Sequence, residues 1–178
     1  MKKTLMLVTG LLLCAVMAFA QGVPLKGEMI AENDASNSGN STIIMTPGTR
    51  DGSASWQFTG SVNNKYQWAY VLWEIEPDTA SLANLKAATS ISFKILGDGK
   101  TYTARIVSSA VKDFAYHEFQ VKTKAGQIEE IKIPITNFKQ ASWGKAVRLR
   151  PEDMTAVQFA NSNLGAYDVS MWDLKTIK

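Results

Sequence analysis

Three aromatic residues occupy alternate positions of one segment of the chain, at Tyr66, Trp68 and Tyr70. Side chains at alternate positions of an extended chain point to the same side, so these rings would form a row on one face of a strand. Aromatic rings stack on the apolar faces of sugar rings and supply a large contact area at a low cost in conformational entropy. The row therefore indicates a carbohydrate-binding surface.

Polar side chains that can hydrogen-bond sugar hydroxyls follow in two further alternating segments, residues 101–107 and 115–122. If these segments and residues 66–75 are neighbours in one sheet, their outward positions meet on one face. The candidate carbohydrate-binding residues on that face are Trp68, Tyr70, Arg105, Tyr116, Glu118 and Gln120, beside Tyr66 and Thr103. The alternative is that the rings pack beneath loops as a second small hydrophobic cluster, because aromatic residues are common in strands for packing reasons alone.

Residues 1–20 have the pattern of a secretory signal peptide, with two lysines, an apolar stretch and an Ala-Phe-Ala cleavage site at residues 18–20. No later segment reaches the ~20 apolar residues of a membrane-spanning helix. We therefore expect an exported protein, periplasmic or extracellular, with no transmembrane segment in its mature chain. Cys14, the only cysteine, gives the less favoured alternative of a lipid anchor, because the residue before it is Leu13 where a small residue is usual.

The mature chain, residues 21–178, would hold 158 of the 178 residues, which suits a single domain with its own core. Without the two lysines of the signal peptide, 17 of the 19 basic residues remain against 16 acidic ones, and they form no block of like charge. Nucleic acid and anionic membrane surfaces are therefore not expected partners.

Residue types for catalysis are sparse in this chain. Acidic residues are scattered, and the adjacent Glu129 and Glu130 have the pattern of an exposed strand end rather than of a glycosidase carboxylate pair. The single histidine, His117, shares the inward parity of Phe119 and Val121, which predicts a partly buried core residue. One histidine with no mature cysteine does not supply a usual zinc site, and no nucleophile-elbow or phosphate-loop motif is present. We expect no catalytic residues, no cofactor and no enzymatic activity.

A polar segment, residues 33–41, consists almost entirely of Asn, Ser, Asp and Gly. We interpret it as a solvated loop between two short strands, near residues 28–31 and 42–45. The alternative is a cation-binding loop, since Ca²⁺ takes several carboxylate, amide and backbone oxygens as ligands. Only Glu32 and Asp34 carry charge there, and Asp34 is the candidate ligand.

Alternation of apolar and polar residues recurs along the mature chain in short segments separated by turn residues. Residues 91–107 show it most clearly, as two alternating runs around an Asp-Gly turn, and this pattern predicts a β-hairpin with one apolar face. Residues 82–88 are predicted to form a short helix or turn, with Ser81 as its cap. Pro47-Gly48 and Asp51-Gly52 are predicted turns.

The number and spacing of these segments predict the fold class. Roughly nine to eleven short strands, turns at intervals near ten residues and no long amphipathic helix are typical of an all-β sandwich or barrel. A two-sheet antiparallel jelly roll is the expected architecture, because each sheet can bury one alternating face and leave the other in water.

Five segments of the chain carry a family resemblance. They are DASNSGNST (Asp34–Thr42), SWQFTGSV (Ser55–Val62), LKAATSISFKILGDGKTYTARI (Leu85–Ile106), IKIPITNFKQASWG (Ile131–Gly144) and AVQFANSNLGAYDVSMWDL (Ala156–Leu174). In this order they resemble the complex I intermediate-associated protein 30 domain and the related family 11 carbohydrate-binding modules. The resemblance implies a galactose-binding-like jelly roll whose concave face binds glucan chains, and often a structural Ca²⁺.

The resemblance also has consequences for individual residues. It implies sugar contacts from the concave strands, which carry Trp68, Tyr70, Arg105 and Tyr116 over by strand position. It makes Asp173 the second candidate calcium ligand beside Asp34, although Trp172 lies where the family often has an aspartate before it. A mitochondrial branch of the family assists assembly of a respiratory complex, and the signal peptide leads us to set that role aside.

Two hypotheses follow for the function. The first is an exported, non-catalytic β-sandwich that recognises a polysaccharide or other glycan, with Trp68, Tyr70 and Tyr116 as stacking surfaces and Arg105, Glu118 and Gln120 as hydroxyl partners. The alternative is a structural or assembly protein of the cell envelope that binds another protein through the same face. A domain without an attached hydrolase favours this alternative, because binding modules usually accompany enzymes.

Overall fold

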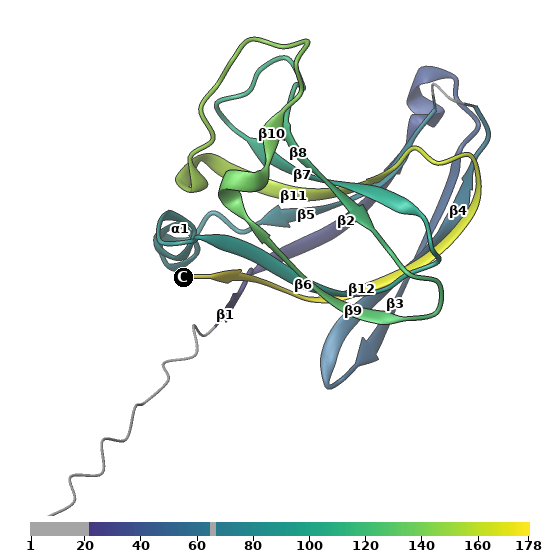
Figure 1. Ribbon diagram of the computed structural model, residues 1–178, viewed down its shortest axis with the longest axis horizontal. Coiled ribbons are helices and arrows are strands. Elements are labelled where there is room, and N and C mark those ends of the chain that lie inside the picture. Colours follow the sequence, from purple (N-terminus) through teal and green to yellow (C-terminus); the bar gives the residue numbers. More distant parts are fainter. Residues whose placement is uncertain (1–21, 65–66) are drawn as a thin grey trace, which may run out of the picture.

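Two antiparallel sheets pack face to face in the computed structural model, which describes residues 22–64 and 67–178 (Figure 1). Sheet A has the order β3 (Thr42–Arg50), β4 (Ser53–Val62), β12 (Gly165–Ile177), β6 (Ser90–Leu96) and β9 (Ile128–Pro134), with β1 (Gly22–Pro24) paired to the end of β12. Sheet B has the order β10 (Lys139–Gln140), β8 (His117–Lys122), β7 (Thr101–Ser108), β11 (Met154–Asn161), β5 (Ala69–Ile75) and β2 (Gly27–Asn33). The predicted jelly-roll sandwich is therefore confirmed.

Among the described residues, four short helical segments join the strands: α1 (Thr79–Lys86) and the 3₁₀ turns η1 (Asp34–Asn37), η2 (Ile135–Asn137) and η3 (Pro151–Asp153). Figure 1 shows α1 at one end of the sandwich, in the connection from sheet B to sheet A. The predicted cap at Ser81 is wrong. Asp78 caps α1, because its Oδ1 accepts a hydrogen bond from the Ser81 backbone N–H at 2.6 Å.

The predicted parity of the central strands is confirmed. Ile91, Phe93 and Ile95 on β6, and Tyr102 with its alternate neighbours on β7, are all buried between the sheets. Rings from the two sheets meet there: Phe159 of β11 packs at 4.8 Å from the ring of Tyr102 and at 6.0 Å from that of Phe93. Burial of these side chains drives the two sheets together.

The predicted hairpin of residues 91–107 is wrong. The strand β6 pairs with β12 and β9, whereas β7 pairs with β11 and β8, so the Asp-Gly turn carries the chain from sheet A to sheet B. A Cβ atom on Gly97 would lie 2.3 Å from the Cβ of Thr123, and Gly99 has φ +88°. The turn therefore needs glycine for close packing and for a left-handed backbone, as a hairpin turn would. Alternation shows which side chains face inward, but not which strand lies beside them.

Two predicted turns near the start of the sandwich have different outcomes. Asp51 and Gly52, with φ of 50° and 76°, form the turn between β3 and β4 as predicted. Pro47 and Gly48 do not form a turn, because both lie within β3 and pair with Trp56 and Ser55. The strand β3 is at the edge of sheet A, where a proline without an N–H is tolerated.

The predicted signal peptide, Cys14 and Tyr66 lie outside the described residues. Within residues 22–64 and 67–178, the structure contains no helix with the length and apolarity that a membrane crossing requires.

Candidate functional site

The predicted aromatic and polar residues lie on the outer face of sheet B, the face turned away from sheet A. The strands β7 and β8 are neighbours as expected, but β11 separates β5 from β7. The central position of this face is therefore Gln158 of β11, which pairs with Leu72 on one side and Arg105 on the other. The sequence analysis had not placed Gln158 on this face.

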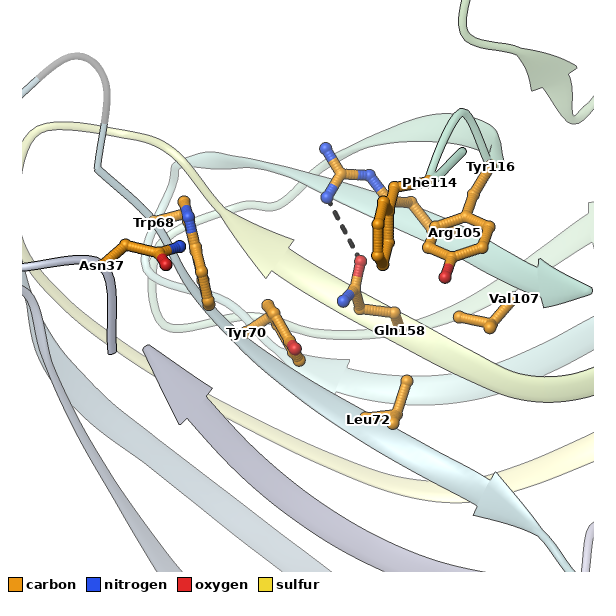
Figure 2. Close-up of a pocket in the computed structure, with 9 residues that line it drawn as sticks. All are labelled: Asn37, Trp68, Tyr70, Leu72, Arg105, Val107, Phe114, Tyr116 and Gln158. Carbon is orange, nitrogen blue, oxygen red and sulfur yellow. Dashed lines mark hydrogen bonds between the residues drawn. The ribbon is translucent and has the colours of Figure 1, made fainter. Parts of the chain in front are cut away.

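An open groove of about 440 Å³ crosses this face. The groove is lined by Asn37, Trp68, Tyr70, Leu72, Arg105, Val107, Phe114, Tyr116 and Gln158, as Figure 2 shows. In Figure 1, the loop containing η1 and the loops around residues 109–116 and 141–150 rise at opposite ends of the face. The groove therefore crosses the strands between two groups of loops.

One wall of the groove consists of Trp68 and Tyr70, whose rings are stacked with centroids 5.0 Å apart and planes at 16°. The Tyr70 hydroxyl donates a hydrogen bond to the carboxylate of Glu32, which is opposite it on β2. Burial and this carboxylate raise the pKa of Tyr70 above its usual range. Tyr70 therefore stays protonated at ordinary pH, with its hydroxyl directed to Glu32.

Trp68 precedes β5, and Asp34 holds its backbone in place. The Trp68 N–H donates to Asp34 Oδ2 at 3.1 Å, and the Asp34 N–H donates to the Trp68 carbonyl at 3.2 Å. The Asp34 carboxylate also accepts hydrogen bonds from the N–H and the hydroxyl of Ser41, at 3.0 and 2.8 Å. Burial acts to raise the pKa of Asp34, but these hydrogen bonds outweigh it and lower the pKa. The buried carboxylate thus fixes the loop beneath the tryptophan.

The floor of the groove carries a polar network. Arg105 donates from Nε to Glu118 and from Nη1 to Gln158, each at 3.2 Å. A guanidinium group has five N–H donors, so several remain available to a ligand. Gln120 donates to Thr103 at 3.0 Å on the same face. Glu118 and Gln120 do not line the groove themselves.

The second wall consists of Phe114 and Tyr116, whose rings meet edge to face at 6.2 Å and 84°. Tyr116 was predicted from its strand position. Phe114 was missed, because it lies in a loop, where alternation gives no information about side-chain direction. Of the six predicted carbohydrate-binding residues, the structure brings Trp68, Tyr70, Arg105 and Tyr116 together around one groove.

The two candidate calcium ligands do not come together. Asp34 is next to Ser41 at the start of β3, which pairs through Ser61 with Ala166 of β12. Asp173 lies seven residues further along β12, about 23 Å away at about 3.3 Å per residue. Its carboxylate accepts a hydrogen bond from Lys175 at 3.0 Å. Among the described residues no three His, Cys, Asp or Glu side chains are grouped to hold a metal, and calcium binding stays a prediction.

His117 is buried on β8, where it pairs with the inward-facing Ile106 of β7, as its parity predicted. Its Nδ1 has no hydrogen-bond partner, and burial lowers the pKa of the imidazole, although the Val147 backbone acts in the opposite direction. A buried imidazole without a carboxylate partner is not arranged as a general base. This geometry gives no support for catalysis at His117.

The lowered pKa of His117 has a consequence for stability. The unfolded chain binds a proton at this histidine near its ordinary pKa of 6.5, whereas the folded chain binds it only at lower pH. Acidification through this window therefore favours unfolding. We expect the melting temperature to fall between about pH 7.5 and about pH 5.5, and to fall less in His117→Gln, as measured by calorimetry. Equal slopes in the two proteins would contradict this explanation.

The fold places the protein in the class of jelly-roll β-sandwiches found in carbohydrate-binding modules. The chain belongs to the Complex I intermediate-associated protein 30 family, whose model matches residues 18–171. A comparison with the curated proteins found no significant match.

Solved structures confirm the architecture. The family 11 carbohydrate-binding module of the cellulosomal cellulase Lic26A-Cel5E of Clostridium thermocellum superposes with a TM-score of 0.71 at 11% identity, over 90% of this chain and 96% of that one. A family 11 module from the same organism, solved with a β-1,3-1,4-mixed-linked tetrasaccharide, gives 0.69 at 11% identity, over 89% and 97%. A family 30 module of the cellulase Cel9D-Cel44B gives 0.56 at 15% identity, over 86% and 92%.

Proposed function

We propose that this protein is an exported, non-catalytic carbohydrate-binding β-sandwich that holds a glycan in the groove on the outer face of sheet B. The observation that carries the proposal is the combination of aromatic rings on both walls with a guanidinium and an amide on the floor. Rings stack on the apolar faces of sugars, and the polar floor hydrogen-bonds their hydroxyls. The likeness to carbohydrate-binding modules supports this proposal through the fold.

The shape of the groove favours a single glycan chain. The two aromatic walls lie at the starts of β5 and β8, and the strands β11 and β7 lie between them. Three strand spacings of about 4.8 Å separate the walls by about 14 Å across the sheet. A flat crystalline polysaccharide surface suits rings that lie in one plane. A soluble chain enters a groove and contacts both walls and the floor. We therefore assign soluble polysaccharide chains as the ligand class.

Affinity gel electrophoresis against a panel of soluble glycans tests this proposal. We expect retardation by at least one soluble polysaccharide and no retention on crystalline cellulose, with bovine serum albumin as the control for non-specific retardation. Unchanged mobility on every glycan would overturn the proposal. A stoichiometric protein partner captured from envelope extract, without glycan binding, would select the alternative of a structural or assembly protein.

Export is part of the proposal and rests on the sequence pattern of residues 1–20. Cleavage before Gln21 removes Cys14, whereas a lipid anchor would retain it. Intact-mass measurement of the protein from the cell envelope distinguishes the two outcomes.

A further inference from the structure

Phe114 has an unusual combination of backbone conformation and exposure. Its φ is 63°, and it is the only aromatic residue with a positive φ in the part of the chain that the structure describes. This left-handed conformation is costly for a bulky side chain, because Cβ approaches the following carbonyl oxygen. Burial of the Phe114 side chain does not offset that cost, since 76% of the residue is exposed to solvent.

The loop around Phe114 is nevertheless fixed on both sides. Asp113 accepts a hydrogen bond on Oδ1 from the Ala115 N–H at 3.2 Å and another on Oδ2 from the Lys145 N–H at 2.7 Å. The Tyr116 N–H donates to the Phe114 carbonyl at 2.8 Å. A Cβ atom on Gly144 would lie 2.1 Å from the Cβ of buried Ala115, so the second loop packs directly on the first. One carboxylate therefore joins the two loops that rise at this end of the groove.

The constrained ring faces the groove. In Figure 2 the rings of Trp68 and Phe114 are both seen edge-on, with Tyr70 and Gln158 between them. Both rings line the same groove, although they come from loops at its opposite ends. The Phe114 ring is exposed, its backbone is strained, and hydrogen bonds on both sides fix its loop. Such a ring is arranged to bind a ligand rather than to pack in the core.

We propose that Phe114 is a preset binding residue that stacks on one sugar ring of a glycan chain whose other rings extend to Trp68, and that Asp113 is its positioning residue. The inference rests on the proposed function and adds to it the preset conformation of Phe114 and the positioning role of Asp113. Holding the ring in its binding conformation before the ligand arrives reduces the entropy lost on binding. The backbone strain at Phe114 is thus offset by a higher affinity for the glycan.

Glycine at position 114 separates this role from a structural one. Phe114→Gly removes the ring and relieves the left-handed strain, so we expect the melting temperature to rise by about 2 °C while affinity for the best glycan falls at least about tenfold. The matched variant Leu164→Gly replaces another exposed apolar loop residue, with no positive φ, and is expected to lower the melting temperature slightly. Calorimetry of unfolding and of glycan binding supplies both measurements.

A double-mutant cycle tests the positioning residue. Asp113→Ala is expected to weaken binding several-fold in the wild-type background and to cause no further loss in Phe114→Gly, because Asp113 acts through the ring. A further loss of the same size in both backgrounds would overturn the role of Asp113. If the wild-type protein binds glycan and Phe114→Gly binds it equally well, the inference about Phe114 is wrong and the proposed function still stands. If the wild-type protein binds no glycan, the proposed function itself has failed.

Discussion

Trp172→Ala is expected to destabilise the domain by about 3–5 kcal/mol, the range for removal of a fully buried aromatic side chain. Trp172 follows the inward-facing Met171 on β12 and points to the opposite face of sheet A, yet only 1% of its surface is exposed. The turn between β3 and β4 covers it. The indole N–H donates to Asp51 at 3.2 Å, and the Arg50 guanidinium lies 5.6 Å from the ring centroid. Truncation would leave a cavity beneath that turn and remove one of the two hydrogen bonds to Asp51 Oδ2, the other of which comes from Lys94 at 3.0 Å.

Thermal unfolding measures this loss as a fall in melting temperature of about 8–16 °C. Trp143→Ala is the matched control, because Trp143 is 68% exposed in the loop after β10, and its removal is expected to change stability by less than about 0.5 kcal/mol. Similar losses in the two variants would show that the turn does not bury Trp172 in solution.

Trp68→Ala is expected to weaken glycan binding by roughly 10- to 100-fold, which corresponds to about 1.4–2.8 kcal/mol. The variant removes a ring from the stacked pair that forms one wall of the groove. The fold should survive, because both hydrogen bonds between Trp68 and Asp34 that fix this position use the tryptophan backbone. Isothermal titration with the glycan selected from the panel measures the change.

Ile44→Ala is the control for this measurement, since Ile44 is 63% exposed on β3 of sheet A, the sheet that does not carry the groove. Its affinity should match that of the wild-type protein. If the affinity of Trp68→Ala for the glycan is within twofold of the wild-type affinity, Trp68 is not part of the binding site. The stacked aromatic pair would then need a different explanation.

Alternation alone predicted much of the fold because it is a local property. Successive side chains of a strand must point to opposite sides. The buried set on β6 and the outward direction of Trp68 and Tyr70, at the start of β5, therefore follow from the sequence without knowledge of their neighbours. Turn chemistry is local too, and it located the reversals at Asp51-Gly52 and at Gly97–Lys100. The sequence therefore predicted the sandwich and four of the nine residues that line the groove.

Strand partners were decided by the tertiary structure. The choice between a hairpin and a crossover at Gly97–Lys100 depends on which arrangement buries both apolar faces across the whole sandwich. The insertion of β11 between β5 and β7 depends likewise on pairings between segments far apart in sequence. That insertion placed Gln158 at the centre of the groove floor.

The sequence by itself determined which side chains face the core and which face solvent, because the geometry of an extended backbone imposes that alternation residue by residue. Only the tertiary structure decided which solvent-facing side chains share a groove. Phe114 shows the reason: its direction is set by a hydrogen bond from Lys145 to Asp113 and by the close packing of Gly144 on Ala115. Contacts between two loops thirty-two positions apart in the sequence produce no periodic pattern of residue types from which they could be predicted.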